Sequence, residues 1–403
     1  MEARKTAYDI LYRVFYEHGY ASLLMRQIKE DQPSMAFISQ LVYGTIRNRS
    51  FLEYQWKDLA IKTRPKAEVL LDMACYELFF MSSKDYAVVN EAVMIAAKKD
   101  KAFVNAVLHQ VVKRGKRETD DLSIALGMPE WIIRLWNAHY GEEKCRELLH
   151  VFQKPAVVYG RWNPLKAEMN QLSEASHYTW IDQWSFSSDI PIQKTRDFMH
   201  GRTLIQNPSS VLPALMMDVK PGMKVLDTCA SPGTKTQMLA VLMENRGSIT
   251  ACDLYPHRLA LIDQLMEKTG VTIVHTMVAD GTKKREDEVE SYDRVLCDVP
   301  CSGLGDLRHK PEIRWHLTPD DLDEILMIQK TILETSASFV KNGGRLVYST
   351  CTLNHRENTK QITAFLKRHS EFELIEEKTI FPDEIHDGFY AACMVKKERD
   401  MIE

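Results

Sequence analysis

Two cysteines follow predicted strands in the C-terminal half of the chain. Cys301 lies in the segment 298–303 (DVPCSG), and Cys351 lies in the segment 348–352 (YSTCT). One cysteine at the end of a strand is most often a small buried residue. Two of them at strand ends that can be neighbours, with Asp298 three residues before Cys301, indicate chemistry instead.

A pair of thiols beside a carboxyl group suits one kind of covalent catalysis. Carbon 5 of cytosine is a poor nucleophile, but addition of a thiolate at carbon 6 gives an enamine whose carbon 5 attacks an activated methyl group. Cysteine fits this step because its thiolate is both a strong nucleophile and a good leaving group. A carboxyl group near ring nitrogen 3 supports charge during the addition. A base must then remove the proton from carbon 5 before the thioether is eliminated.

A second pattern predicts a site for a nucleoside cofactor. The segment 225–236 (VLDTCASPGTKT) runs from an apolar strand through a loop of small residues into a helix. Gly233 permits close backbone approach, and a helix N-terminus offers free N–H groups. Asp253 ends the next predicted strand, where an acid accepts hydrogen bonds from ribose hydroxyls. Asp280 ends the third strand, where it would meet an adenine edge.

This loop differs from two common nucleotide-binding loops. Nicotinamide-dependent enzymes more often have GxGxxG, whereas this loop contains a single glycine and Pro232. The first glycine of the Walker A pattern is also missing. A strand–turn–helix junction without any ligand remains an alternative on this segment alone.

The elements that carry these motifs alternate between strand and helix from about residue 206. We predict strands over 225–226, 249–253, 273–278, 294–296 and 345–348, and helices over 238–243, 258–268 and 325–339. This alternation predicts an α/β domain with a parallel, doubly wound sheet. Ligands of such sheets bind outside the carboxyl ends of the strands, and each motif above falls at such an end.

The first third of the chain is predicted to be helical and basic. Apolar residues recur there at helical spacing, and residues 1–118 contain 19 Lys and Arg against 14 Asp and Glu. The whole chain carries a net charge of −4, so the remainder is acidic. A basic module beside an acidic one suggests contact with a polyanion, although chance variation of a solvated surface explains it as well. The run 113–117 (KRGKR) is either an RNA contact or a solvated linker.

We therefore expect three parts: a helical domain over 1–118, a helical linker with a small α/β subdomain over 119–205, and the α/β domain over 206–403. In the middle part we predict a strand over 157–159 and a helix over 165–172. The chain has no signal-peptide core and no apolar run long enough for a bilayer, so the cytoplasm is the expected compartment. Its eight cysteines form no CxxC pair, and neither a metal site nor a disulfide framework is expected.

The motifs resemble those of the RNA 5-methylcytosine methyltransferases of the Sun/NOP2 family. The resemblance rests on 298–303, 348–352 and 229–236, and the pairs 314–315 (RW) and 357–358 (EN) match in place. The first third is similar to the helical NusB-type RNA-binding domain, on the segments 43–47 (YGTIR) and 103–108 (FVNAVL). That pairing, followed by 127–131 (GMPEW), is similar to bacterial members that modify small-subunit (16S) ribosomal RNA.

The resemblance implies a Rossmann-like methyltransferase domain and a role for each motif. Cys351 would be the nucleophile, Cys301 would assist product release, and Asp298 would contact the cytosine. S-adenosylmethionine, the expected methyl donor, would be held by Cys229, Ala230, Ser231, Pro232, Gly233, Thr234, Lys235, Asp253, Arg258, Asp280 and Asp298. The expected partner is RNA, with neither DNA nor membrane. The sequence names neither the modified cytosine nor an oligomeric state.

Departures from the family pattern and alternative functions remain. Ser231 and Thr234 stand where Ala and Gly are usual, which puts the cofactor affinity in doubt, and Asn207 replaces a more usual acid after Gln206. An exocyclic-amino methyltransferase needs no thiol and usually has an aromatic residue where Cys301 stands. A noncatalytic RNA-binding factor would not need both cysteines. The opposite assignment of the two thiols is a further competitor, because DNA cytosine-5 enzymes use the Pro-Cys thiol as nucleophile.

Overall fold

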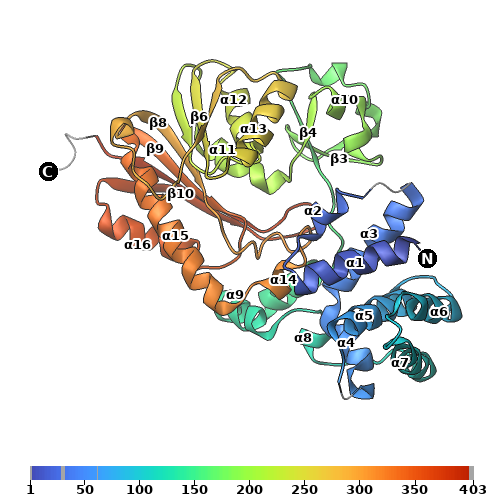
Figure 1. Ribbon diagram of the computed structural model, residues 1–403. Helices are drawn as coiled ribbons and strands as arrows, with labels where there is room; N and C mark the ends of the chain where they lie inside the picture. The colour runs from blue at the N-terminus through green and yellow to red at the C-terminus, as the bar shows by residue number, and fades with distance from the viewer. Residues whose placement is uncertain (1, 29–31, 61, 399–403) are drawn as a thin grey trace. The chain divides into compact units, whose positions relative to one another are not determined.

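The computed structural model describes residues 2–28, 32–60 and 62–398, and the described chain forms two compact units (Figure 1). The first unit contains the described residues up to Pro155 together with Leu307–Thr318, and the second contains Ala156–Asp306 and the described residues from Pro319 onward. Among the described helices, none is long and apolar enough to cross a membrane. The predicted domain limits at residues 118 and 205 remain a prediction.

The first unit is built from helices, as the apolar spacing predicted. The helices are α1 (Glu2–Tyr16), α2 (Ala21–Met25), α3 (Gln32–Arg47), α4 (Arg49–Trp56), α5 (Pro65–Phe80), α6 (Asp85–Ile95), α7 (Lys101–Arg114), α8 (Leu122–Ala125), α9 (Glu130–Val151) and α14 (Ile313–His316). Their apolar faces share one core, in which Leu11, Leu41, Leu70 and Leu108 are fully or almost fully buried. Helix α9 bends at Gly141, whose φ of +83° is not helical.

A short segment from the second half of the sequence belongs to the helical unit. Arg314 of α14 is buried and donates hydrogen bonds to the carbonyl oxygens of Arg47 (3.3 Å), Gly127 (3.2 Å) and Phe152 (2.9 Å). The indole of Trp315 donates to the carbonyl of Ile46 at 2.7 Å. The pair 314–315, noted from sequence as matching a methyltransferase family, is therefore integrated into the helical core.

A small four-stranded sheet begins the second unit, and two local predictions were wrong there. Its strands are β1 (Gly160–Trp162), β2 (Tyr178–Trp180), β3 (Ser185–Ser188) and β4 (Thr203–Ile205), in the order β2-β3-β1-β4, with α10 (Arg196–Met199) beside them. The strand predicted over 157–159 is irregular, and β1 begins one residue later; Val157 and Val158 are exposed.

The helix predicted over 165–172 is also absent, apart from a single 3₁₀ turn at Met169–Gln171. Leu165 packs into the core of the large sheet, whereas Leu172 packs into the core of the small one. The two leucines, although spaced as on one helix face, thus pack into two different cores. The side chain of Asn163 accepts a hydrogen bond from the N–H of Leu165 (3.3 Å). This bond stabilises the irregular backbone from Asn163 to Leu165.

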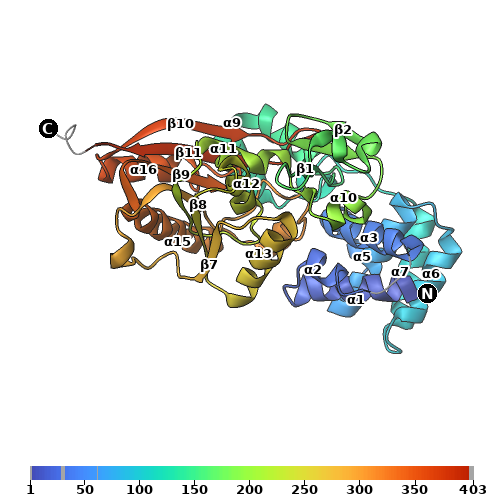
Figure 2. The same ribbon diagram turned by 90° about the horizontal axis from the view of Figure 1, so that it is seen from above.

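The large sheet has seven strands and confirms the doubly wound α/β architecture. Its strands are β5 (Lys224–Asp227), β6 (Ser248–Asp253), β7 (Val274–Val278), β8 (Tyr292–Asp298), β9 (Val340–Thr350), β10 (Phe372–Ile380) and β11 (Phe389–Lys396), in the order β10-β11-β9-β8-β5-β6-β7. The five strands from β9 to β7 are parallel, as predicted. Strands β11 and β10 add an antiparallel edge beside β9 that the sequence analysis did not include (Figure 2).

Helices cover both faces of this sheet (Figure 1). The helices are α11 (Leu212–Met216), α12 (Thr234–Leu242), α13 (Pro256–Thr269), α15 (Pro319–Ser338) and α16 (Thr359–Arg368). One core joins α11, α12 and α13 to sheet residues such as Val225 and Leu296, and the other joins α15 and α16 to Leu226 and Cys297. Successive strand residues therefore enter opposite cores. Because both faces of the sheet are covered by helices, a ligand would bind at the carboxyl ends of the parallel strands.

Candidate active site at the carboxyl edge of the sheet

The two strand-end cysteines lie together. Strands β8 and β9 are parallel neighbours with Asp298 opposite Ser349, so the loops that follow them leave the sheet side by side. The Sγ atoms of Cys301 and Cys351 are 3.3 Å apart, and both residues are half-buried. All eight cysteines are free thiols, so these two lie close together without forming a disulfide.

The two thiols share a hydrogen bond of 3.3 Å. It raises the pKa of Cys301 well above its usual value, and burial and the nearby charges of Cys351 and Glu357 act in the same direction. A neutral Cys301 thiol can donate its S–H to a thiolate at Cys351. The arrangement therefore accommodates one thiolate and one thiol.

Asp298 lies at the end of β8 between a hydroxyl and a cation. Ser349 donates its hydroxyl to Oδ1 of Asp298 at 2.6 Å, and the Nζ of Lys235 is 2.7 Å from Oδ2. Burial lowers the pKa of Lys235, but the charge and hydrogen bond of Asp298, together with the charges of Cys351 and Asp227, outweigh burial and raise that pKa. Lys235 thus keeps its positive charge next to the carboxylate and close to the thiol pair.

The loop between β5 and α12 presents backbone groups at the same edge. The N–H of Ala230 donates to the carbonyl of Cys252 at 2.8 Å, which attaches the loop to β6. Gly233 precedes α12 with a φ of +100°, a left-handed conformation that glycine adopts without strain. Thr234 begins α12, so the substitution noted in the sequence falls inside the helix and not at the left-handed position. Pro232 follows Ser231 through a cis peptide bond.

Cys229 is a third thiol near this edge, but it packs as a core residue. It lies against the apolar cluster under α15 and α16. Burial raises its pKa well above the usual value, and the neighbouring Cys297 and Asp227 add to the rise. Cys229 therefore stays a neutral thiol and contributes shape to the loop.

Asp227 is a candidate cofactor residue that the sequence analysis did not select. It is the last residue of β5, is 1% exposed, and accepts a hydrogen bond from Thr236 at Oδ2 (2.7 Å). Its other oxygen, Oδ1, is buried and has no hydrogen-bond partner. Burial, assisted by the charge of Asp298, raises its pKa to about 7. A buried acceptor without a donor is costly, so this oxygen fits a donor group of a ligand. The sequence signal that could have identified Asp227 is its position at the end of a predicted strand, like that of Asp253.

Two of the remaining predicted cofactor residues, Asp253 and Arg258, lie at the end of β6 and in α13. Asp253 ends β6, is buried, and accepts a hydrogen bond from the N–H of Tyr255 at 3.2 Å. Arg258 reaches back from α13, with Nε 3.5 Å from Asp253 and an Nη 3.5 Å from the carbonyl of Ser231. Arg258 thus connects the acid to the small-residue loop.

Asp280 lies just beyond β7 and is held by Thr282. The hydroxyl and the N–H of Thr282 donate to its Oδ1 at 2.6 and 3.0 Å, and these bonds lower the pKa of Asp280. The other oxygen is 3.5 Å from the Nζ of the exposed Lys283. The carboxylate is therefore charged and half-exposed at the edge strand.

The basic run 113–117 packs against its own helical unit. Arg114 and Arg117 both pair with Asp58, at 2.7 and 2.9 Å, and Arg117 also stacks on the Tyr54 ring. Lys116 lies over the rings of Phe51 and Phe80. Three of the four cations in the run thus already contact acidic or aromatic side chains of α4, of the turn that follows α4, and of α5. By contrast, Lys98, Lys99 and Lys101 are exposed.

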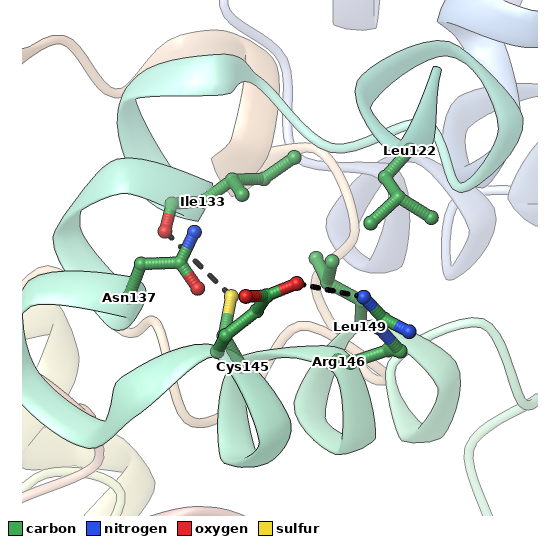
Figure 3. A pocket seen from close by; sticks show the side chains of 7 residues that line it. Leu122, Ile133, Asn137, Cys145, Arg146 and Leu149 are labelled. Atoms are coloured by element: carbon green, nitrogen blue, oxygen red, sulfur yellow. Dashed lines mark hydrogen bonds and ion pairs between the residues drawn. The ribbon is translucent and has the colours of Figure 1, made fainter. Parts of the chain in front are cut away.

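A hollow of about 350 Å³ lies in the helical unit (Figure 3). It opens between the two arms of α9, with Ile133 and Asn137 on one arm and Cys145, Arg146 and Leu149 on the other. The Cys145 thiol donates to the carbonyl of Ile133 at 3.6 Å, and Arg146 pairs with Glu142. The hollow lies where α9 bends at Gly141, which separates the two arms.

Comparisons with known proteins place both units in families. A model of the family "16S rRNA methyltransferase RsmB/F" matches residues 214–398, and a model of the NusB family matches residues 1–113. A probable ribosomal RNA small subunit methyltransferase B of Bacillus subtilis is 33% identical, over 98% of this chain and 98% of the relative. The ribosomal RNA small subunit methyltransferase B of Thermus thermophilus is 28% identical, over 88% of this chain and 85% of the relative.

Solved structures share the fold. The crystal structure of PH0851 covers 98% of this chain and 99% of its own, with a TM-score of 0.84 at 24% identity. A methyltransferase homologue from Pyrococcus horikoshii covers 69% of this chain and 98% of its own, with a TM-score of 0.61 at 27% identity.

Proposed function

Because the chain belongs to the 16S rRNA methyltransferase RsmB/F family, we propose that it methylates carbon 5 of a cytosine in small-subunit ribosomal RNA, with Cys351 as the nucleophile. The family identifies it as a ribosomal RNA cytosine methyltransferase; the residue roles are the proposal. The observation that carries them is the 3.3 Å approach of the Cys301 and Cys351 sulfurs beside Asp298. Neither an exocyclic-amino methyltransferase nor a noncatalytic RNA-binding protein needs such a pair.

The carboxyl edge of β5, β6 and β7 suits S-adenosylmethionine. The unpartnered Oδ1 of Asp227 fits the ammonium group of its methionine part, and the buried carboxylate of Asp253 fits the ribose hydroxyls. Asp280 and the loop from Cys229 to Lys235 would complete the site, with Arg258 fixing Asp253 against that loop. When bound, S-adenosylmethionine supplies a methyl group on a positively charged sulfur.

The first step belongs to Cys351. Its thiolate adds to carbon 6 of the cytosine, and the electron pair of the C5–C6 double bond moves toward carbon 5 and ring nitrogen 3. The Cys301 thiol donates a hydrogen bond to the Cys351 sulfur, and Lys235 holds Asp298 in place. Asp298 accepts a hydrogen bond from the exocyclic amino group of the cytosine, and the positive charge of Lys235 beside it offsets the negative charge that develops at ring nitrogen 3. Carbon 5 then takes the methyl group.

The second step returns the enzyme to its starting state. The proton on carbon 5 passes to a water molecule, and its electron pair restores the C5–C6 double bond. The C6–S bond breaks, and its electrons return to Cys351 as a thiolate. The neutral thiol of Cys301, 3.3 Å away, stabilises that leaving thiolate by donating its S–H. Cys301 therefore acts mainly on release.

The test is to locate the transferred methyl group. Small-subunit ribosomal RNA is incubated with the protein and methyl-labelled S-adenosylmethionine, digested to nucleosides and separated. We expect the label in 5-methylcytidine, and none with the Cys351→Ala variant, which should still bind the cofactor. Label on the exocyclic nitrogen, or no label with a folded, cofactor-binding protein, would contradict the proposal.

A further inference from the structure

A buried carboxylate lies beneath both cysteine loops. Glu357 follows β9 and precedes α16, and it is completely buried. Its Oε2 accepts a hydrogen bond from the N–H of Ser302 at 2.8 Å, and its Oε1 accepts one from the Ser302 hydroxyl at 2.5 Å. Ser302 is the residue next to Cys301, so Glu357 holds the first loop one residue from its sulfur.

The same carboxylate also holds the second loop. The Nδ2 of Asn354 donates to Oε1 at 2.9 Å, and the hydroxyl of Thr352, next to Cys351, lies 3.4 Å from the same oxygen. The hydroxyls of Ser302 and Thr352 are 2.7 Å apart, which joins the loops directly. Glu357 is therefore bonded to a neighbour of each sulfur.

Helix α15 supplies the last partner. The Nε2 of Gln329 donates to Oε2 of Glu357 and to the carbonyl of Pro300, both at 3.0 Å. No cation pairs with Glu357 in the described parts of the chain, so its charge is balanced by hydrogen-bond donors alone. Burying a charge in this way is costly. A carboxylate has only acceptor positions, and here the donors come from the two cysteine loops and from α15.

Resting on the proposed function, we propose that Glu357 is a positioning residue that sets the separation of the two catalytic thiols and thereby the rate of product release. During release the carbon 5 proton passes to water, the C6–S bond breaks and its electrons return to Cys351. This elimination depends on the S–H of Cys301 reaching the departing sulfur. The first step depends less on that distance, since it needs only the Cys351 thiolate and the cytosine.

The variant Glu357→Gln keeps the shape of the side chain but offers a single acceptor oxygen. Its NH₂ group must then face donors, either those of Ser302 and Gln329 or those of Ser302 and Asn354. A matched control is Asp197→Asn in the small sheet. Asp197 is also fully buried and accepts hydrogen bonds from the N–H groups of Ser173 and Glu174, both at 3.0 Å.

The experiment compares single-turnover methyl transfer, multiple-turnover rate and the protein–RNA adduct that survives denaturation. For Glu357→Gln we expect near-normal single turnover, a multiple-turnover rate lower by about 10- to 100-fold, and accumulated adduct. Asp197→Asn should lose thermal stability without accumulating adduct. Normal turnover in Glu357→Gln would overturn the proposal, as would an equal loss of both rates.

A milder variant covers the case in which Glu357→Gln does not fold. Ser302→Ala removes one hydroxyl donor and leaves the backbone N–H, so we expect adduct to accumulate with a turnover roughly 2- to 10-fold lower. A wild-type adduct level in Ser302→Ala would then overturn the proposal. Failure of the proposed function has a separate signature: the wild-type protein would give no 5-methylcytidine, or Cys351→Ala would still form the adduct.

Discussion

The residues of the site are chemically unequal even where their types are the same. Cys301 and Cys351 are both strand-end thiols 3.3 Å apart, yet we assign them different steps, attack on the base to Cys351 and release to Cys301. The acids differ as well. Asp298 is paired with Lys235, whereas Asp227 is buried with an unpartnered oxygen.

Asp227 predicts a pH dependence of cofactor binding. Burial raises its pKa to about 7 in the folded protein, above the usual acid value, so the folded state holds a proton that the unfolded state loses between about pH 4 and 7. Without ligand, this contribution stabilises the protein at low pH and is lost as the pH rises through 7. An ammonium group at Oδ1 requires the carboxylate, so cofactor affinity should fall as the pH falls below 7.

The measurement is calorimetric titration of S-adenosylmethionine between pH 5.5 and 7.5. We expect the affinity of the wild-type protein to drop by up to about tenfold per pH unit below 7. Asp227→Asn should bind more weakly, with an affinity that varies little over the same range. A wild-type affinity as flat as that of the variant would remove Asp227 from the site.

At the scale of elements, the parallel strands and their helices follow from the sequence, because alternating apolar runs and small-residue loops specify β5 to β9. The strand-end rule also predicted that Cys301 and Cys351 lie close together. The antiparallel strand β10 was not predicted, since its charged edge residues hide the alternation. The contacts of Glu357 were not predictable either, because they depend on the conformations of two loops and on the placement of α15.

The turn into α12 gives a prediction at this scale. Gly233 has a φ of +100°, and an added Cβ would lie 3.3 Å from side chains of Ile262 and Met266. Gly233→Ala should lower the free energy of unfolding by about 1–2 kcal/mol through backbone strain, and should weaken S-adenosylmethionine binding by moving the loop. Gly222 is the control, with a φ of +89° and open space around it.

Gly222→Ala should cost similar stability, measured by chemical denaturation, and leave cofactor affinity unchanged. Equal cofactor affinities for both variants would show that the loop does not form the binding site.

At the scale of the whole molecule, a helical unit and a methyltransferase unit are joined through more than one connection. Residues 312–316 belong to the helical core although they follow the Cys301 motif closely in sequence. A chain shortened to residues 119–403 would deprive Arg314 of the Arg47 carbonyl and Trp315 of the Ile46 carbonyl. RNA capture by the helical unit is therefore better tested by point substitutions in the full-length protein.

Exposed lysines should give RNA binding its salt dependence. Replacing Lys98, Lys99 and Lys101 by Gln should weaken binding of small-subunit ribosomal RNA and reduce the slope of log affinity against log salt by about 2 to 3. Lys116→Gln should reduce the slope less, because that lysine already lies over two aromatic rings and near Glu118. Filter binding at several salt concentrations measures both. An unchanged slope in the triple variant would assign RNA capture to other residues.

The assignment of the two thiols is tested most directly by denaturing gels of Cys301→Ala and Cys351→Ala, each incubated with substrate RNA and S-adenosylmethionine. If Cys351 attacks carbon 6 and Cys301 assists release, Cys301→Ala should form a protein–RNA adduct that survives denaturation. Cys351→Ala should form none and transfer no methyl group, while still binding the cofactor. An adduct with Cys351→Ala and none with Cys301→Ala would contradict the account and reverse the roles of the two cysteines.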